Sequence, residues 1–168
     1  MWRRLALPGV SCGLALLSSS AIAAGPTITA VTFSGGQAHP TITIVGSGFG
    51  ARPSPSPGYH PPSLSHPLCP VKPTKPLAAY GFDYGTRLFL VDSTQRPIWA
   101  AGRYRPGLPE LDCIGLLIER YTPTKVVYRL GAAYPHVPTA PATYALAAGD
   151  SYAVGVNGAS FSGKVHYS

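Results

Sequence analysis

The stretch PTITAVTFSGGQAHPTITIVGSGFG, residues 26–50, predicts two short strands joined by a turn and closed by a second, glycine-containing turn. Threonine, isoleucine and valine dominate both runs, and such β-branched residues suit a pleated, half-buried surface. Residues 41–45 alternate cleanly, which places Ile42 and Ile44 inward and the threonines outward. The apolar residues of 26–33 (Ile28, Val31 and Phe33) are unevenly spaced, so we expect a kink or bulge there. This pair of strands predicts the start of a sheet.

The glycine-rich run at 46–50 is a turn in this interpretation. A phosphate-binding loop of this kind needs a helix to begin behind it, and here prolines follow instead. Residues 51–76 contain nine prolines in 26 residues and little to bury. We therefore expect a long loop of polyproline character, inserted between two strands.

After this insertion the pattern of short strands resumes. Strands are expected at 86–92, 97–101, 113–119, 124–130, 151–156 and 160–167. Residues 86–92 are apolar on both faces, which favours a central strand, whereas 97–101 begins with Pro97 and is expected at a sheet edge. Asn157-Gly158 predicts the turn of a hairpin, because both residues tolerate a positive φ. The inward residues of the last four strands are expected to be Ile114, Leu116, Ile118, Val126, Tyr128, Leu130, Tyr152, Val154, Val156, Phe161, Val165 and Tyr167.

No helical period is visible after residue 23, so the sequence predicts about seven or eight short strands joined by turns. This pattern predicts an all-β fold, a β-sandwich. The length of 168 residues suits one domain, which we expect over residues 24–168, and a hydrophobic fraction of 45% is enough for a core. The 19 glycines and 19 prolines belong to many turns.

Residues 1–23 predict a signal peptide. Arg3 and Arg4 give a positive start, an uncharged apolar stretch follows, and Ala21 and Ala23 are the small residues that signal peptidase requires. We expect a secreted, periplasmic or cell-surface protein without a stable membrane anchor after cleavage. Removing Arg3 and Arg4 from the 13 basic residues leaves 11 against 6 acidic ones, a net charge of about +5. The basic residues form no cluster, so a nucleic-acid partner is not expected.

Export leaves two cysteines in the mature chain, Cys69 and Cys113, which are expected to form a disulfide in an oxidising compartment. The bridge would close a loop of over forty residues and stabilise the fold by about 3–4 kcal/mol. The alternative is a metal site that includes His66. A closed zinc site needs four such ligands, and only His66 and Cys69 are locally spaced, so no metal is expected.

A small secreted hydrolase is the alternative to a binding protein. Asp83 and Asp112 are both expected in loops and could form a carboxylate pair of the kind that a glycosidase uses. Loop aspartates also cap turns, and no Gly-x-Ser-x-Gly elbow is present. We therefore expect no catalytic residue and no cofactor.

Loop aromatics are the better candidates for function. Tyr80, Tyr84, Tyr104 and Tyr134 are expected at strand ends or in loops, where sandwiches carry their binding sites. Aromatic rings flanked by polar groups bind both sugars and proteins, so the partner is predicted to be a glycan or another extracellular protein. These rings could instead pack against the core, and Trp99 is expected to do so.

Four short patterns, taken in order, resemble the IPT/TIG family of immunoglobulin-like domains. They are P-x-I-x-x-V at 26–31, T-I-T-I-x-G-x-G-F at 41–49, T-x-V at 124–126 and L-x-x-G-D-x-Y-x-V-x-V-x-G at 146–158. The resemblance spans 26–50 and 124–165; the turn at 37–39 is poorer in glycine than is common in the family. It implies an immunoglobulin-like β-sandwich that acts as an extracellular spacer or interaction module, with no catalytic residues to carry over.

Overall fold

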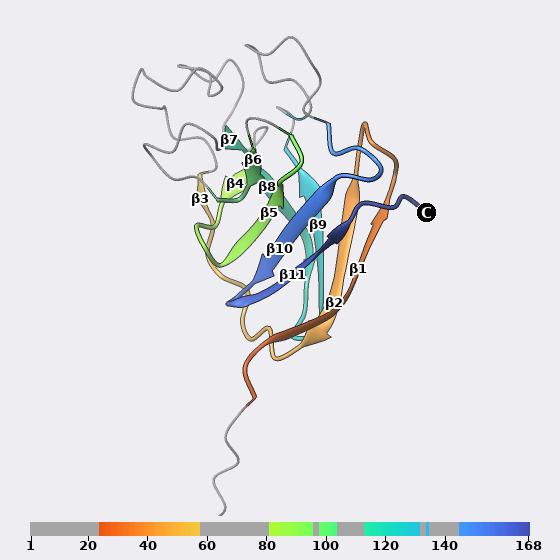
Figure 1. The fold of residues 1–168 in the computed structure, drawn as a ribbon. Helices are drawn as coiled ribbons and strands as arrows, with labels where there is room; N and C mark the ends of the chain where they lie inside the picture. Colours follow the sequence, from red (N-terminus) through yellow and green to blue (C-terminus); the bar gives the residue numbers. More distant parts are fainter. Residues whose placement is uncertain (1–23, 58–80, 96–97, 104–112, 132–133, 135–144) are drawn as a thin grey trace, which may run out of the picture.

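The computed structural model describes residues 24–57, 81–95, 98–103, 113–131, 134 and 145–168, and within these ranges it contains strands and connecting turns but no helix (Figure 1). No helix in these ranges is long and apolar enough to cross a membrane. Eleven described strands form two sheets that pack as a β-sandwich, so the predicted all-β class is confirmed. Three strands, β3, β4 and β7, have only two residues each and account for the excess over the predicted seven or eight.

Each sheet is continuous from edge to edge, and neighbouring strands are antiparallel apart from β6 and β7. Sheet A contains, in spatial order, β1 (Thr27–Ser34), β2 (Thr41–Ser47), β9 (Lys125–Leu130), β8 (Leu116–Tyr121), β4 (Phe82–Asp83) and β3 (Ser56–Pro57). Sheet B contains β11 (Ala159–Lys164), β10 (Ser151–Val156), β5 (Leu88–Asp92), β6 (Trp99–Ala101) and β7 (Cys113–Ile114).

The first two strands pair as the sequence predicts. Val31 lies opposite Ile44 and Phe33 opposite Ile42, and all four side chains face the other sheet. The register shifts between Ile28 and Ala30, which is the predicted bulge. The extra residue lets Ile28 and Val31 both point inward despite their spacing.

The turn at 46–50 places Phe49 in the core, where its ring is fully buried. Gly48 and Gly50 have positive φ values of 70° and 69°, which a residue with a side chain rarely adopts. Gly46 leaves room for the ring, because a Cβ there would come within 2.6 Å of Phe49. The glycines of this run therefore serve a tight turn around a buried aromatic residue.

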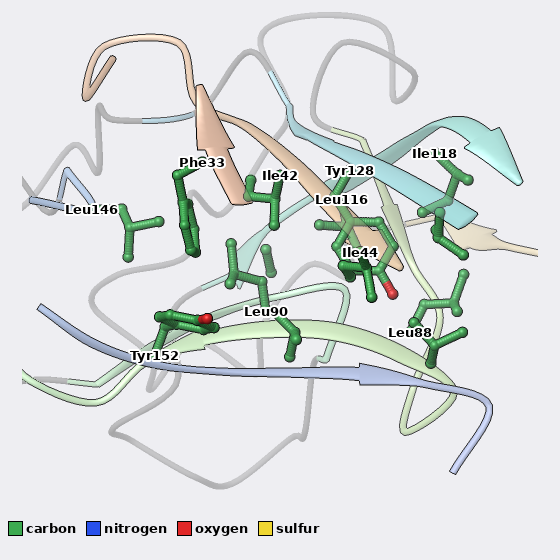
Figure 2. Close-up of a cluster of buried hydrophobic side chains, with 14 of the residues drawn as sticks. Phe33, Ile42, Ile44, Leu88, Leu90, Leu116, Ile118, Tyr128, Leu146 and Tyr152 are labelled. Atoms are coloured by element: carbon green, nitrogen blue, oxygen red, sulfur yellow. The ribbon is translucent and has the colours of Figure 1, made fainter. Parts of the chain in front are cut away.

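The core lies between the sheets (Figure 2). Phe33, Ile42 and Tyr128 of sheet A face Leu90 and Tyr152 of sheet B. Every residue predicted to face inward is buried or packs against this core, and Trp99 is fully buried as expected.

Two strand predictions were wrong in detail. The strand at 97–101 is not at an edge, because β6 lies between β5 and β7. The expected strand at 113–119 divides at Gly115, so that β7 joins sheet B and β8 joins sheet A. A pattern of apolar residues marks both pieces as buried, but it does not say to which sheet each belongs.

The short pair β3 and β4 was not predicted. Pro57 lies opposite Phe82 and Ser56 opposite Asp83. β3 is an edge strand, the position in a sheet that tolerates proline. The remainder of the proline-rich insertion, residues 58–76, lies outside the described residues.

The C-terminal hairpin is confirmed. Asn157 and Gly158 have φ values of 46° and 99° and join β10 to β11. β11 ends at Lys164, earlier than expected, and Tyr167 then forms an isolated parallel bridge with Phe33 on β1. The backbone N–H of Ser168 donates to the Phe33 carbonyl at 3.1 Å. The end of the chain thus lies along the otherwise open edge of sheet A.

Candidate functional site

The two described tyrosines of the predicted binding set lie in the core. Tyr84 is 3% exposed and Tyr134 is 7% exposed. Tyr134 donates its hydroxyl hydrogen to the Gln37 carbonyl at 2.7 Å, accepts from the Leu146 N–H at 2.9 Å, and packs edge-on against Trp99. Burial raises the pKa of its phenol. Neither ring is an exposed platform, because both rings are buried in the core. The Tyr134 hydroxyl is also already hydrogen-bonded to backbone groups.

The rest of the predicted set cannot be placed. Tyr80, Tyr104 and Cys69 lie outside the described residues, and so does the side chain of Cys113 at the start of β7. A binding role for Tyr80 and Tyr104, and the disulfide, stay predictions.

Only one of the two carboxylates of the hydrolase alternative lies within the described residues. Asp83 is 6% exposed and accepts a hydrogen bond from the Gly85 N–H at 2.6 Å, which is a turn-capping contact. Asp112 lies outside the described residues. Within the described ranges, no group of three or more His, Cys, Asp or Glu is arranged to hold a metal ion.

The outward-facing side of sheet A offers a broader surface. Its central row runs across β1, β2 and β9 as Thr32, Thr43 and Val127, which are register partners. One further row lies on each side of it. These rows are Ala30, Val45 and Lys125, and Ser34, Thr41 and Arg129. We call these nine residues, with Arg120 opposite Val127 on β8, the outer face of sheet A.

This outer face is polar and carries mostly positive charge. Among the described residues Val45 is the only exposed large apolar side chain, at 41%, whereas Val127 at the centre of the face is 9% exposed. Lys125, Arg129 and Arg120 supply three cations, and Glu119 is the acid beside them, with its carboxylate 3.4 Å from Arg129. Both members of that ion pair are at least half exposed, so it is worth at most about 1 kcal/mol and leaves the guanidinium accessible.

The outer side of sheet B, on the opposite side of the sandwich, carries an aromatic residue. Phe89 points outward from β5 and lies against Gly155, where a Cβ would come within 2.0 Å of the ring. The guanidinium carbon of Arg103 lies 5.2 Å from the ring centre. This aromatic residue is therefore already covered on one side by backbone and contacted by a cation of the same chain.

The sequence predicted which way the side chains of this outer face point. Alternation placed the threonines of β2 outward and Val126 and Tyr128 of β9 inward, as observed, which leaves Lys125 and Arg129 on the outer side. The sequence did not show that Thr32, Thr43 and Val127 lie side by side, because β9 is far from β1 and β2 in the sequence. No protein-family model matches this chain, and no curated protein or solved structure is significantly similar to it.

Proposed function

We propose that this chain is an exported, non-catalytic interaction module of the immunoglobulin-like IPT/TIG type, which binds an anionic extracellular glycan on the outer face of sheet A. The observation that carries the proposal is a set of three cations beside four hydroxyl groups, those of Thr32, Ser34, Thr41 and Thr43, on the outer face of sheet A. Export, on which the extracellular partner depends, rests on the signal peptide predicted at residues 1–23.

The strand order supports the immunoglobulin-like part of the proposal. Immunoglobulin-type sandwiches place strands A, B, E and D in one sheet and G, F and C in the other. Here β1-β2-β9-β8 follows the first order and β11-β10-β5 the second, with β6 beside β5. The patterns that resemble the IPT/TIG family lie largely on β1, β2, β9 and β10 of this arrangement.

The composition of the face favours a glycan over a protein partner. Protein interfaces draw most of their affinity from buried aromatic and arginine anchors at a desolvated centre. The centre of this face carries Thr32, Thr43 and Val127 instead, and its cations lie along one side. Hydroxyl groups can donate to and accept from sugar hydroxyls, while Lys125 and Arg129 attract carboxylate or sulfate groups.

The test measures binding of the mature protein to immobilised polygalacturonate, to heparin and to neutral dextran. We expect binding to an anionic polymer that weakens as salt increases, and no binding to dextran. The double variant Lys125→Gln, Arg129→Gln should lose most of the affinity. The matched control, Arg87→Gln with Lys164→Gln, removes the same charge from the residue before β5 and from the end of β11, and it should bind nearly as well as the wild type.

Three results would contradict the proposal. The first is equal loss in both double variants, which would indicate attraction by net charge alone. The second is equal binding to neutral dextran, and the third is no binding to either anionic polymer at low salt.

A further inference from the structure

Two carboxyl groups lie together inside the end of the sandwich where β5 finishes and β10 begins. Asp92, the last residue of β5, is fully buried, and Asp150, just before β10, is 9% exposed. Gln95 lies between them in the hydrogen-bond network. Its side-chain nitrogen donates to Oδ2 of Asp150 at 3.2 Å, and its backbone N–H lies 3.4 Å from Oδ1 of Asp92.

The hydrogen bonds of this pair are unequal. Asp150 Oδ2 accepts from the Ala147 N–H at 2.7 Å as well as from Gln95. Asp92 Oδ1 accepts from the Thr94 N–H at 2.9 Å, but Asp92 Oδ2 has no donor in the described structure. A buried carboxylate oxygen without a donor costs free energy that a proton on that oxygen would remove.

No described counter-ion compensates the charge of Asp92. Tyr134 and Tyr167 are the titratable groups that face the pair from neighbouring segments. Burial first, and then the two carboxylates, raise the pKa of their phenols, that of Tyr167 to about 12. Neither aspartate forms an ion pair with a lysine, arginine or histidine within the described ranges. Burial, followed by the neighbouring Asp150, raises the pKa of Asp92 from 3.8 to about 6.

We propose that Asp92 takes up a proton in mildly acidic solution and donates it from Oδ2 to the carboxylate of Asp150, which fastens residues 145–151 to the end of β5. The proton belongs on Asp92 because this residue is more deeply buried and has the oxygen without a donor.

The segment held in this way closes one end of the core. Leu146 is fully buried; its N–H donates to Tyr134 and its carbonyl accepts from the Tyr167 hydroxyl at 2.6 Å. The Gln95 side chain also donates to the Ala145 carbonyl at 2.8 Å. With both carboxylates ionised, their repulsion favours opening of this end; with one proton shared, the same contacts close it.

The sign of the pH dependence follows from linkage. Because folding raises the pKa of Asp92, the folded state gains stability as the pH falls through about 6 and loses it as the pH rises through that value. Between pH 7.5 and pH 5 this group alone should raise the folding equilibrium constant about tenfold. The inference does not depend on the proposed glycan face.

The test compares chemical denaturation of the wild type and Asp92→Asn at both pH values. Asparagine is neutral and can donate to Asp150 at any pH, so the ratio of wild-type to variant folding constants should rise about tenfold from pH 7.5 to pH 5. Glu119→Gln, at an exposed acid, is the control and should leave this pH dependence unchanged. A ratio that is the same at both pH values would overturn the proposal.

Two further measurements use the wild-type protein, in case Asp92→Asn does not fold. Carbon-13 NMR of the Asp92 carboxyl should give a titration midpoint near 6, and a midpoint below about 4.5 would sink the idea. Millimolar Ca²⁺ should not stabilise the protein at pH 7.5. If it does, and the gain exceeds that from acidification, the pair holds a cation instead of a proton and the proposal fails.

Discussion

Tyr128 joins the two sheets through a single hydroxyl group. It is fully buried on β9, and its hydroxyl donates to the carbonyl of Gly155 on β10 at 2.6 Å. Burial raises the pKa of this phenol well above its usual value. The side chain therefore stays a neutral donor at neutral pH, and its hydrogen bond links one sheet to the other.

Tyr128→Phe should destabilise the protein by about 1–2 kcal/mol, because the ring remains but a buried carbonyl loses its donor. Tyr152→Phe is the matched control. Tyr152 is also buried, yet its hydroxyl makes no hydrogen bond within the described part of the chain, so its loss should cost little. Urea denaturation measures the free energy of unfolding of both variants. An equal loss of stability in the two would contradict the bridging role of Tyr128.

The hairpin between β10 and β11 also holds the turn that follows β2. Asn157 has a φ of 46°, and its side-chain nitrogen lies 2.5 Å from the Phe49 carbonyl and 2.7 Å from the Tyr121 hydroxyl. The Tyr121 hydroxyl in turn donates to the Phe49 carbonyl at 2.7 Å. One turn residue thus serves both a local backbone conformation and a contact between the sheets.

Two substitutions separate these roles. Asn157→Gly keeps the positive φ but loses the amide contacts, and should cost about 1 kcal/mol. Asn157→Ala loses both and should cost about 2 kcal/mol. Urea denaturation of both variants is the measurement, and an alanine variant as stable as the glycine variant would show that the backbone conformation contributes nothing.

Local patterns were sufficient to predict most elements. The alternation at 41–45 and the Asn157-Gly158 turn specify β2 and the last hairpin without help from the rest of the chain. β3 and the division of 113–119 at Gly115 depend on partners distant in sequence, so no local signal marks them. The Asp92–Asp150 pair was missed for the same reason. An aspartate at the end of a strand or in a turn gives no local sign that the fold will bring a second carboxylate beside it.

The whole molecule should unfold as one cooperative unit, since a single core joins the two sheets. Trp2 belongs to the predicted signal peptide, which leaves the fully buried Trp99 as the one tryptophan of the mature chain. Its fluorescence should shift to longer wavelength on unfolding, with the same urea midpoint as the far-ultraviolet circular dichroism. Separate midpoints would indicate that the β6 end of the sandwich opens independently.

The bridge between Tyr167 and Phe33 has a consequence for solubility. An open edge strand presents unpaired backbone groups that can recruit a strand from another molecule and begin aggregation. Tyr167 and Ser168 occupy the backbone of β1 at Phe33, and the bulge after Ile28 distorts the remainder of that edge. Tyr167 and Ser168 therefore cover part of an edge that could otherwise serve as a template for fibril growth.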